Sequence, residues 1–234
     1  MNGSLFLFPV TLGDSPIMQV LPQHNQSTIM KIKHFIVENV RTARRFLKLV
    51  DRAFDIDACS FYELNKHTSP AAIASYLAPC LKGEDIGLLS EAGCPCCADP
   101  GNVIVEMAHQ QGITVVPLVG PSSILLSLMA SGFNGQNFAF LGYLPIDDNE
   151  RARALKRMEQ RIYTEHQTQI FIETPYRNHK LIETLTKICP PTMKLCVAAN
   201  LSCEGESITT LPIKAWKSRS YQYSKTPAIF LLYK

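Results

Sequence analysis

The chain is predicted to be an α/β protein, because a strand-loop-helix pattern occurs twice in its centre. Residues 86–89 and 114–118 are apolar runs of strand length, and each ends in a loop rich in Gly, Pro and small polar residues. An apolar segment of helical length follows each loop. Repeated units of this kind are typical of a parallel sheet, whose ligands bind at the carboxyl ends of the strands.

The N-terminal part adds elements around these two units. Strands are expected at three apolar segments: residues 5–12, 34–38 and 59–64. Gly13 would close the first strand in a tight loop, and Asn39 is expected to cap a helix that runs to about residue 53. Ser69, followed by proline, would start another helix that ends near residue 83. Residues 14–27 contain two prolines and are expected to be irregular.

After Gly132 the pattern changes, and a turn signal follows at Asn134-Gly135. We therefore predict an N-terminal α/β domain at residues 1–134 and a C-terminal α/β domain at residues 135–234. Two helices are expected in the second domain, at residues 150–164 and 174–188. Its expected strands are residues 138–141, 169–173, 194–198, 207–211 and 228–232.

Composition limits the class of protein. The chain of 234 residues is 46% hydrophobic and 18% charged, which is typical of a folded globular protein. It has neither a run long enough to span a membrane nor a basic n-region, so we expect a cytoplasmic protein that does not contact membranes. Cys94 and Cys97 form a C-x-x-C pair without a second pair or nearby histidines, so no metal is expected.

Basic residues gather in two segments predicted to be helical, although the net charge is only +3. Each segment is either a solvated helix face or a nucleic-acid contact, and the sequence leaves both possibilities open. The basic residues are Arg41, Arg44, Arg45, Lys48 and Arg52 in the first segment, and Arg151, Arg153, Lys156, Arg157 and Arg161 in the second.

Common catalytic signatures are missing from the sequence. It has no P-loop lysine motif, no G-x-G-x-x-G after a strand, no G-x-S-x-G and no H-E-x-x-H. The central loops instead offer backbone groups, the carboxylate of Glu91 and the hydroxyls of Ser122 and Ser123. Such a set suits a polar, zwitterionic cofactor that is recognised largely by the main chain.

Three motifs in these loops carry a family resemblance. They are Ser-Glu-Ala-Gly-Cys-Pro with Ala-Asp-Pro-Gly at 90–101, Val-Val-Pro-Leu-Val-Gly-Pro-Ser at 115–122, and Leu-Gly-Tyr-Leu-Pro at 141–145. The chain resembles the tetrapyrrole-methylase superfamily, the class III S-adenosylmethionine-dependent methyltransferases. The resemblance implies two α/β domains with the cofactor in the cleft between them, and a homodimer. Within the superfamily the chain is most similar to enzymes that methylate the ribose 2′-hydroxyl of a cytidine in 16S ribosomal RNA.

The resemblance also assigns site residues. It implies that S-adenosylmethionine is bound by Leu12, Glu91, Gly93, Cys94, Ser122, Ser123, Ile172, Glu173, Asn200, Leu201, Pro227 and Ala228. Glu38 and Arg41 are the catalytic candidates, because residues 37–41 stand where the family has Ala-Glu-Asp-Thr-Arg. Asn39 replaces the family's aspartate, and Asn200 belongs to a stretch that has lost two charges relative to the family.

Structural roles compete with these assignments. Glu91 and the serine pair could cap helices, and Glu38, Arg41 and Glu173 could form salt bridges. The leading hypothesis is an RNA methyltransferase whose partner is ribosomal RNA or the small ribosomal subunit. The alternatives are a methyltransferase for a small, tetrapyrrole-like molecule, and a degenerate relative that acts as a cofactor-binding or interaction protein.

Overall fold

The structure is a computed structural model that describes residues 2–234, and the chain divides into two compact units between Ser122 and Ser123. The sequence placed the boundary after residue 134 instead. The difference is helix α7 (Ser123–Ser131), which packs against three strands of the second unit. The hydroxyl of Thr210, on one of those strands, also donates a hydrogen bond of 2.9 Å to the carbonyl of Ser131.

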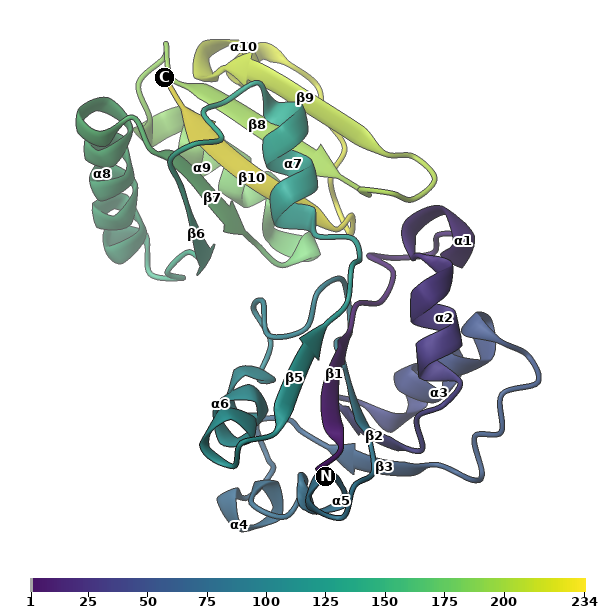
Figure 1. Ribbon diagram of the computed structural model, residues 1–234. Helices are drawn as coiled ribbons and strands as arrows, with labels where there is room; N and C mark the ends of the chain where they lie inside the picture. Colours follow the sequence, from purple (N-terminus) through teal and green to yellow (C-terminus); the bar gives the residue numbers. More distant parts are fainter. Residues whose placement is uncertain (1) are drawn as a thin grey trace. The chain divides into compact units, whose positions relative to one another are not determined.

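The first unit contains a five-stranded sheet in which all neighbouring strands run parallel (Figure 1). The strand order is β3-β2-β4-β1-β5. Its strands are β1 (Ser4–Phe8), β2 (His34–Val37), β3 (Ser60–Glu63), β4 (Ile86–Leu89) and β5 (Thr114–Pro117). All five strands were predicted, and because they are parallel, their carboxyl ends lie along one edge of the sheet.

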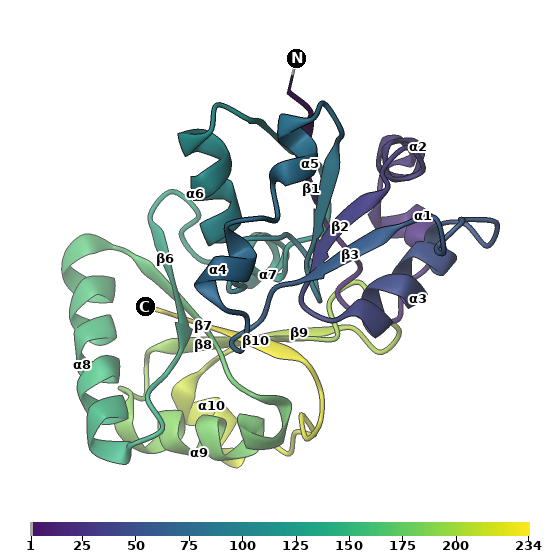
Figure 2. The same cartoon turned by 90° about the horizontal axis from the view of Figure 1, so that it is seen from below.

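Helices cover both faces of this sheet (Figures 1 and 2). One apolar core joins the sheet to α1 (Ile17–Val20), α2 (Gln23–Ile29) and α3 (Val40–Val50). A second core, on the other face, joins it to α4 (Pro70–Ile73), α5 (Ala78–Leu81) and α6 (Asn102–Gln110). The first unit is therefore doubly wound, which explains why strands such as β4 are buried on both faces.

Two expectations for the first unit are wrong, and prolines explain both. Residues 14–27 are not irregular, because Pro16 and Pro22 stand at the N-cap positions of α1 and α2 and so begin helices. The helix expected from Ser69 to residue 83 is broken into α4 and α5. Pro79 has no N–H to donate to the carbonyl of Ser75, which accepts instead from Ala78.

The second unit contains a mixed sheet of order β6-β7-β10-β8-β9. Strands β6 and β7 are parallel, and the other neighbours are antiparallel. The strands are β6 (Phe138–Tyr143), β7 (Thr168–Ile172), β8 (Lys194–Ala199), β9 (Ser207–Pro212) and β10 (Ala228–Tyr233). Each of them matches a predicted strand to within about two residues at either end.

Helix α7 covers one face of this sheet, and three helices share an apolar core with the other (Figures 1 and 2). These are α8 (Asp148–Glu165), α9 (Asn178–Ile188), which follows the short 3-10 helix η1 (Pro175–Arg177), and α10 (Ile213–Ser218). The sequence did not predict α10. Its Trp216 is buried and donates a hydrogen bond of 3.0 Å to the carbonyl of Leu195. Of the helices in residues 2–234, none is both long and apolar enough to cross a bilayer.

Candidate active site

Three loops meet at the carboxyl edge of the first sheet, and we call them the three-loop junction. They follow β1, β4 and β5, and comprise residues 9–13, 90–101 and 118–122. The carbonyl of Gly93 accepts hydrogen bonds from the Val10 amide at 3.0 Å and from the Ser90 hydroxyl at 2.6 Å. The thiol of Cys94 donates to the carbonyl of Pro121 at 3.4 Å. Each loop is therefore tied to at least one of the others.

Gly93 is the residue that allows this close approach. Its φ of +71° lies in the left-handed region that glycine adopts without strain. A Cβ atom there would lie 3.0 Å from the Leu12 side chain and 3.1 Å from the carbonyl of Pro121. Both distances are tighter than ordinary van der Waals contact, so a side chain at this position would force the loops apart.

A cavity of about 210 Å³ opens between this junction and helix α3. Leu12 and Glu91 contribute to its wall from the loops, and Thr42, Arg45 and Leu49 contribute from α3. The Thr42 hydroxyl donates a hydrogen bond of 2.6 Å to one carboxylate oxygen of Glu91. Complete sites for drug-sized ligands usually measure about 300–1,000 Å³, so this cavity would hold only a part of such a ligand.

Glu38 follows β2 at the same edge of the sheet and is half-buried. Burial raises the pKa of its carboxyl above the ordinary value, and the negative charges of Asp99 and Glu91 raise it further, while the backbone of Glu91 opposes the shift. Glu38 and Asp99 both line a small pocket of about 10 Å³, roughly the space of one water molecule. A carboxylate with a raised pKa is suited to accept a proton near neutral pH.

Asp99 is held in place by the loop around it. One of its carboxylate oxygens accepts hydrogen bonds of 2.8 Å from the amides of both Cys96 and Gly101. The sequence did not assign Asp99 a role, although it is part of the Ala-Asp-Pro-Gly motif. It also did not assign Thr42 a role, because no motif there signals a partner for Glu91.

Asn39 caps α3, as predicted. Its side-chain oxygen accepts hydrogen bonds from the amides of Arg41 at 2.8 Å and Thr42 at 3.3 Å. An aspartate would make the same two contacts, so the replacement of the family's aspartate preserves the start of the helix. Arg41 is exposed in the first turn, close in sequence to both Glu38 and Thr42.

Two cysteines of the junction, Cys94 and Cys96, are half-buried, whereas Cys97 is exposed. Burial and the neighbouring Asp99 and Cys97 raise the pKa of Cys96 to about 12, and burial also raises the pKa of Cys94. These thiols are therefore protonated at neutral pH, whereas metal binding requires thiolates. Within residues 2–234, no group of three or more His, Cys, Asp or Glu side chains is arranged to hold a metal ion.

The site residues expected in the second unit gather at one end of its sheet. Ile172, at the end of β7, is paired with Ile229 of β10. The amide of Asn200, which follows β8, donates a hydrogen bond of 3.0 Å to the carbonyl of Pro227, just before β10. Leu201 and Ala228 adjoin this pair in the sequence. The structure therefore brings the end of β7, the end of β8 and the start of β10 together.

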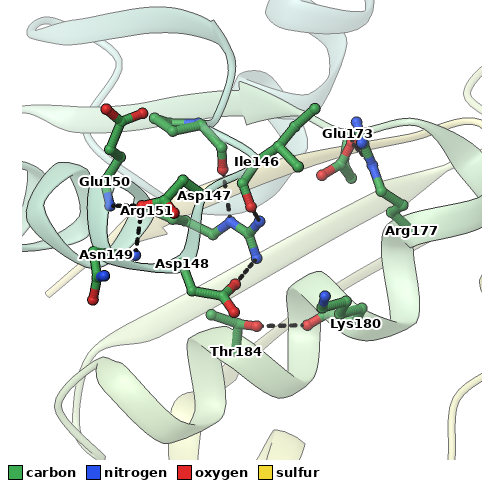
Figure 3. A network of polar contacts seen from close by, with 11 residues as sticks. Ile146, Asp147, Asp148, Asn149, Glu150, Arg151, Glu173, Arg177, Lys180 and Thr184 are labelled. Carbon is green, nitrogen blue, oxygen red and sulfur yellow. Dashed lines mark hydrogen bonds and ion pairs between the residues drawn. The ribbon is translucent and has the colours of Figure 1, made fainter.

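Glu173 lies beside this group but is occupied locally. Its Oε1 atom accepts from the Thr174 amide at 2.6 Å. The same atom accepts from Nε and Nη2 of Arg177 at 2.9 Å and 2.7 Å, and Figure 3 shows these two side chains. Its side chain is almost fully buried. The salt-bridge role that the sequence left open for Glu173 is thus present in the structure.

Comparisons with known proteins identify the fold. The sequence is 28% identical over 212 residues to the ribosomal RNA small subunit methyltransferase I of Escherichia coli O157:H7, and the match covers 91% of this chain and 70% of that protein. The crystal structure of the methyltransferase CobJ matches 99% of this chain and 94% of its own, with a TM-score of 0.65 at 12% identity. The chain has the tetrapyrrole-methylase fold.

Another structure with this tetrapyrrole-methylase fold is a uroporphyrin-III C-methyltransferase from Thermus thermophilus, complexed with S-adenyl homocysteine. It matches 99% of this chain and 98% of its own, with a TM-score of 0.54 at 14% identity. The curated relatives are matched over 58% to 71% of their length, so the chain spans less than two thirds of several of them. No protein-family model matches the chain. The resemblance predicted from the loop motifs is confirmed.

The tetrapyrrole-methylase fold distributes the expected site residues over both units. Leu12, Glu91, Gly93 and Cys94 meet in the three-loop junction, with Glu38 and Arg41 at the adjoining start of α3. Ser122 ends the first unit, and Ser123 begins α7 in the second. Ile172, Glu173, Asn200, Leu201, Pro227 and Ala228 lie at one end of the second sheet.

Proposed function

We propose that this chain is an S-adenosylmethionine-dependent methyltransferase that acts on RNA of the small ribosomal subunit. The observation that carries the proposal is the three-loop junction, which stands beside a half-buried glutamate at the ligand-binding edge of a parallel sheet. Similarity to proteins named ribosomal RNA small subunit methyltransferase I supports the choice of RNA as substrate.

The residues of the first unit fit such a cofactor. Gly93 keeps the junction clear of a side chain where the loop backbones approach one another, and Leu12 adds an apolar surface beside it. Glu91 is exposed, and Thr42 engages one of its carboxylate oxygens. Within residues 2–234 the other oxygen has no hydrogen bond, so it can accept from ligand hydroxyls. We propose that Leu12, Glu91, Gly93, Cys94 and Ser122 contact the cofactor from this unit.

A second set of contacts is proposed for the other unit. Ser123 at the start of α7 offers backbone amides, because the first turn of a helix has no internal acceptors for them. Ile172, Asn200, Leu201, Pro227 and Ala228 present mainly backbone and apolar groups at the end of their sheet. Glu173 would contribute through its backbone or through Oε2, since Oε1 is already occupied.

The proposed catalytic residues act on the nucleophile. When bound, S-adenosylmethionine supplies a methyl group on a positively charged sulfur, which an oxygen nucleophile can attack without a metal. A ribose hydroxyl is a weak nucleophile, so its proton must be removed as the new bond forms. We assign this proton to the carboxylate of Glu38, whose raised pKa favours accepting it. Arg41, exposed in the next turn, would hold a phosphate group of the substrate and thereby orient the hydroxyl.

We also propose that the chain works as a homodimer in the cytoplasm, where ribosomal subunits are available. Exposed apolar side chains support a self-contact in the second unit. Met129 and Leu125 project from α7, and Tyr143, Phe138 and Leu141 project from the edge strand β6. Sedimentation equilibrium of the purified chain tests this: a dimer mass is expected, and a monomer at all concentrations would contradict it.

Calorimetric titration with S-adenosylmethionine and S-adenosylhomocysteine tests the cofactor site. Micromolar binding is expected for the wild type, with at least tenfold weaker binding for Gly93→Val, because this change forces the junction open. Glu106→Ala, which removes an exposed carboxylate from α6, serves as the control and should bind like the wild type. Absence of binding in the wild type would refute the methyltransferase proposal.

The substrate is tested separately, by transfer of a tritiated methyl group from S-adenosylmethionine. We expect incorporation into 16S ribosomal RNA or into small ribosomal subunits lacking the modification. Cofactor binding without transfer to either substrate would refute the RNA proposal and leave the small-molecule and non-catalytic alternatives.

A further inference from the structure

Helix α3 is unusually basic. Its eleven residues include Arg41, Arg44, Arg45 and Lys48 and no acidic residue, and Arg52 follows just beyond its end. Such a concentration of one charge costs free energy through mutual repulsion, unless internal partners or an external ligand compensate it. The contacts of each side chain distinguish between these two possibilities.

Two of the five basic side chains have internal partners. Arg44 forms an ion pair of 3.0 Å with Asp57, and its guanidinium carbon lies 5.9 Å from the centre of the Phe61 ring. The amino group of Lys48 donates hydrogen bonds to the carbonyls of Arg52 at 3.0 Å and Phe54 at 2.7 Å. Both residues therefore fix the chain segment that follows α3.

The other three, Arg41, Arg45 and Arg52, are exposed, and we call them the basic strip. In the part of the chain that the structure describes, their guanidinium groups have no hydrogen bond or ion pair. Arg41, Arg45 and the exposed Leu49 follow one another at intervals of four residues and so lie along one face of α3. Arg52 follows directly after Asp51, the extended C-cap residue of the helix. Arg45 also lines the cavity beside the three-loop junction.

We propose that the basic strip binds the phosphate backbone of the substrate RNA and guides one strand to the cavity, an inference that rests on the proposed function. Guanidinium groups match phosphate oxygens in geometry and charge. The exposed apolar neighbour on this face is Leu49, which offers no ring for a base to stack on, so we infer contact with the backbone rather than with bases. Binding through the strip should therefore depend on salt and little on sequence.

The test compares RNA binding of the wild type and an Arg45→Gln/Arg52→Gln double variant at several salt concentrations. The probe is a labelled single-stranded fragment of 16S ribosomal RNA, followed by fluorescence anisotropy. We expect roughly tenfold weaker binding for the double variant, equally for fragments of different sequence. We also expect the plot of log association constant against log salt concentration to become less steep, with the magnitude of its slope reduced by about 0.7 for each lost contact.

A matched control removes two exposed arginines from the other basic helix, as Arg153→Gln/Arg157→Gln. This variant loses the same net charge and should bind RNA with wild-type affinity. Its salt slope should differ from that of the wild type by less than about 0.3, which is less than half the change expected for one lost contact. Far-UV circular dichroism and the midpoint of urea unfolding should match the wild type for both variants, which shows that they are folded.

The outcomes separate the two proposals. If the wild type binds and methylates RNA but the Arg45→Gln/Arg52→Gln variant matches it in affinity and slope, the basic strip is refuted and the function stands. If the wild type binds the cofactor but no RNA, both the proposed RNA substrate and the proposed role of the basic strip are refuted. If polyglutamate competes for the strip as well as RNA does, an acidic protein replaces RNA as the inferred partner.

Discussion

Helices α3 and α8 are both rich in basic residues, yet they use them differently. Helix α3 has four basic residues and no acidic one, whereas α8 has five basic and four acidic residues. The acidic residues of α8 include Asp148 and Glu150 in its first turn, where negative charge is favourable to a helix. Helix α8 is therefore nearly balanced within itself, and α3 is not.

The clearest contrast is Arg151 of α8, which points inward (Figure 3). Its side chain is almost fully buried and donates hydrogen bonds to the carbonyls of Pro145 and Ile146. Its Nη1 atom lies 3.3 Å from Oδ1 of Asp148. It fastens the loop between β6 and α8 to the helix. A basic segment in a sequence can thus serve the fold or a ligand, and the partners of each side chain decide which.

The two helices also differ in the surroundings of the carboxylate that lies beside each N-cap residue. Both have a capping side chain, Asn39 for α3 and Asp147 for α8, so their first turns are equally well closed. The carboxylate beside the α8 cap, Asp148, is paired with an arginine. The one beside the α3 cap, Glu38, faces the negative charges of Asp99 and Glu91. Unfavourable surroundings of this kind are typical of catalytic groups.

The largest expected effect is that of Glu38→Gln, which keeps the size of the side chain and removes the base. We expect methyl transfer to slow by about a hundredfold or more, because a general base contributes at least that much. Asp148→Asn, the matching change at the start of α8, should leave the rate within twofold of the wild type. Single-turnover transfer of a tritiated methyl group measures both, and a fully active Glu38→Gln enzyme would rule out this base.

A smaller effect, on stability, is expected from Arg151→Met. The variant leaves two partly buried loop carbonyls without their donor and removes the ion pair with the exposed Asp148, which should lower the free energy of unfolding by about 3 kcal/mol. Arg45→Met on α3 removes an exposed side chain and should change it by less than about 0.5 kcal/mol. Urea unfolding followed by circular dichroism compares the two, and equal losses would show that the two helices do not differ as described.

The smallest effect is expected from Asp99→Asn, in the pH dependence of the rate. Burial is the main cause of the raised pKa of Glu38, and the charge of Asp99 adds to it, so neutralising Asp99 should lower that pKa. Glu38 would then remain ionised to lower pH, and the acid limb of kcat/KM against pH should move down by a fraction of a unit. Asparagine keeps the oxygen that accepts from Cys96 and Gly101, so the loop should hold its shape. A limb that stays in place or moves to higher pH would contradict this assignment.

Much of the fold could be predicted from sequence, because apolar periodicity and turn residues carry most of the information. Every strand was located, and the cap at Asn39 was identified from a single residue. The failures involve prolines and tertiary contacts. Pro16 and Pro22 begin helices where breaks were expected, and α10 is held by the burial of Trp216, which no local pattern signals.

The candidate site was predictable only in part. The motifs pointed to the residues of the three-loop junction, because glycine and proline signal tight turns next to strands. Sequence could not show that Thr42 binds Glu91, since 49 residues separate them. It also could not show that Asp99 raises the pKa of Glu38, or that Arg151 is buried while Arg45 is exposed. These facts depend on which loops fold against each other.

The double hydrogen bond at the carbonyl of Gly93 has a consequence for how a ligand arrives. Because this atom accepts from both Val10 and Ser90, and Cys94 continues the connection to Pro121, the loops are ordered before any ligand binds. The loss of conformational freedom that usually opposes binding then occurs during folding. A ligand should associate with such preorganised loops without a slow rearrangement step, so its association rate should rise linearly with its concentration.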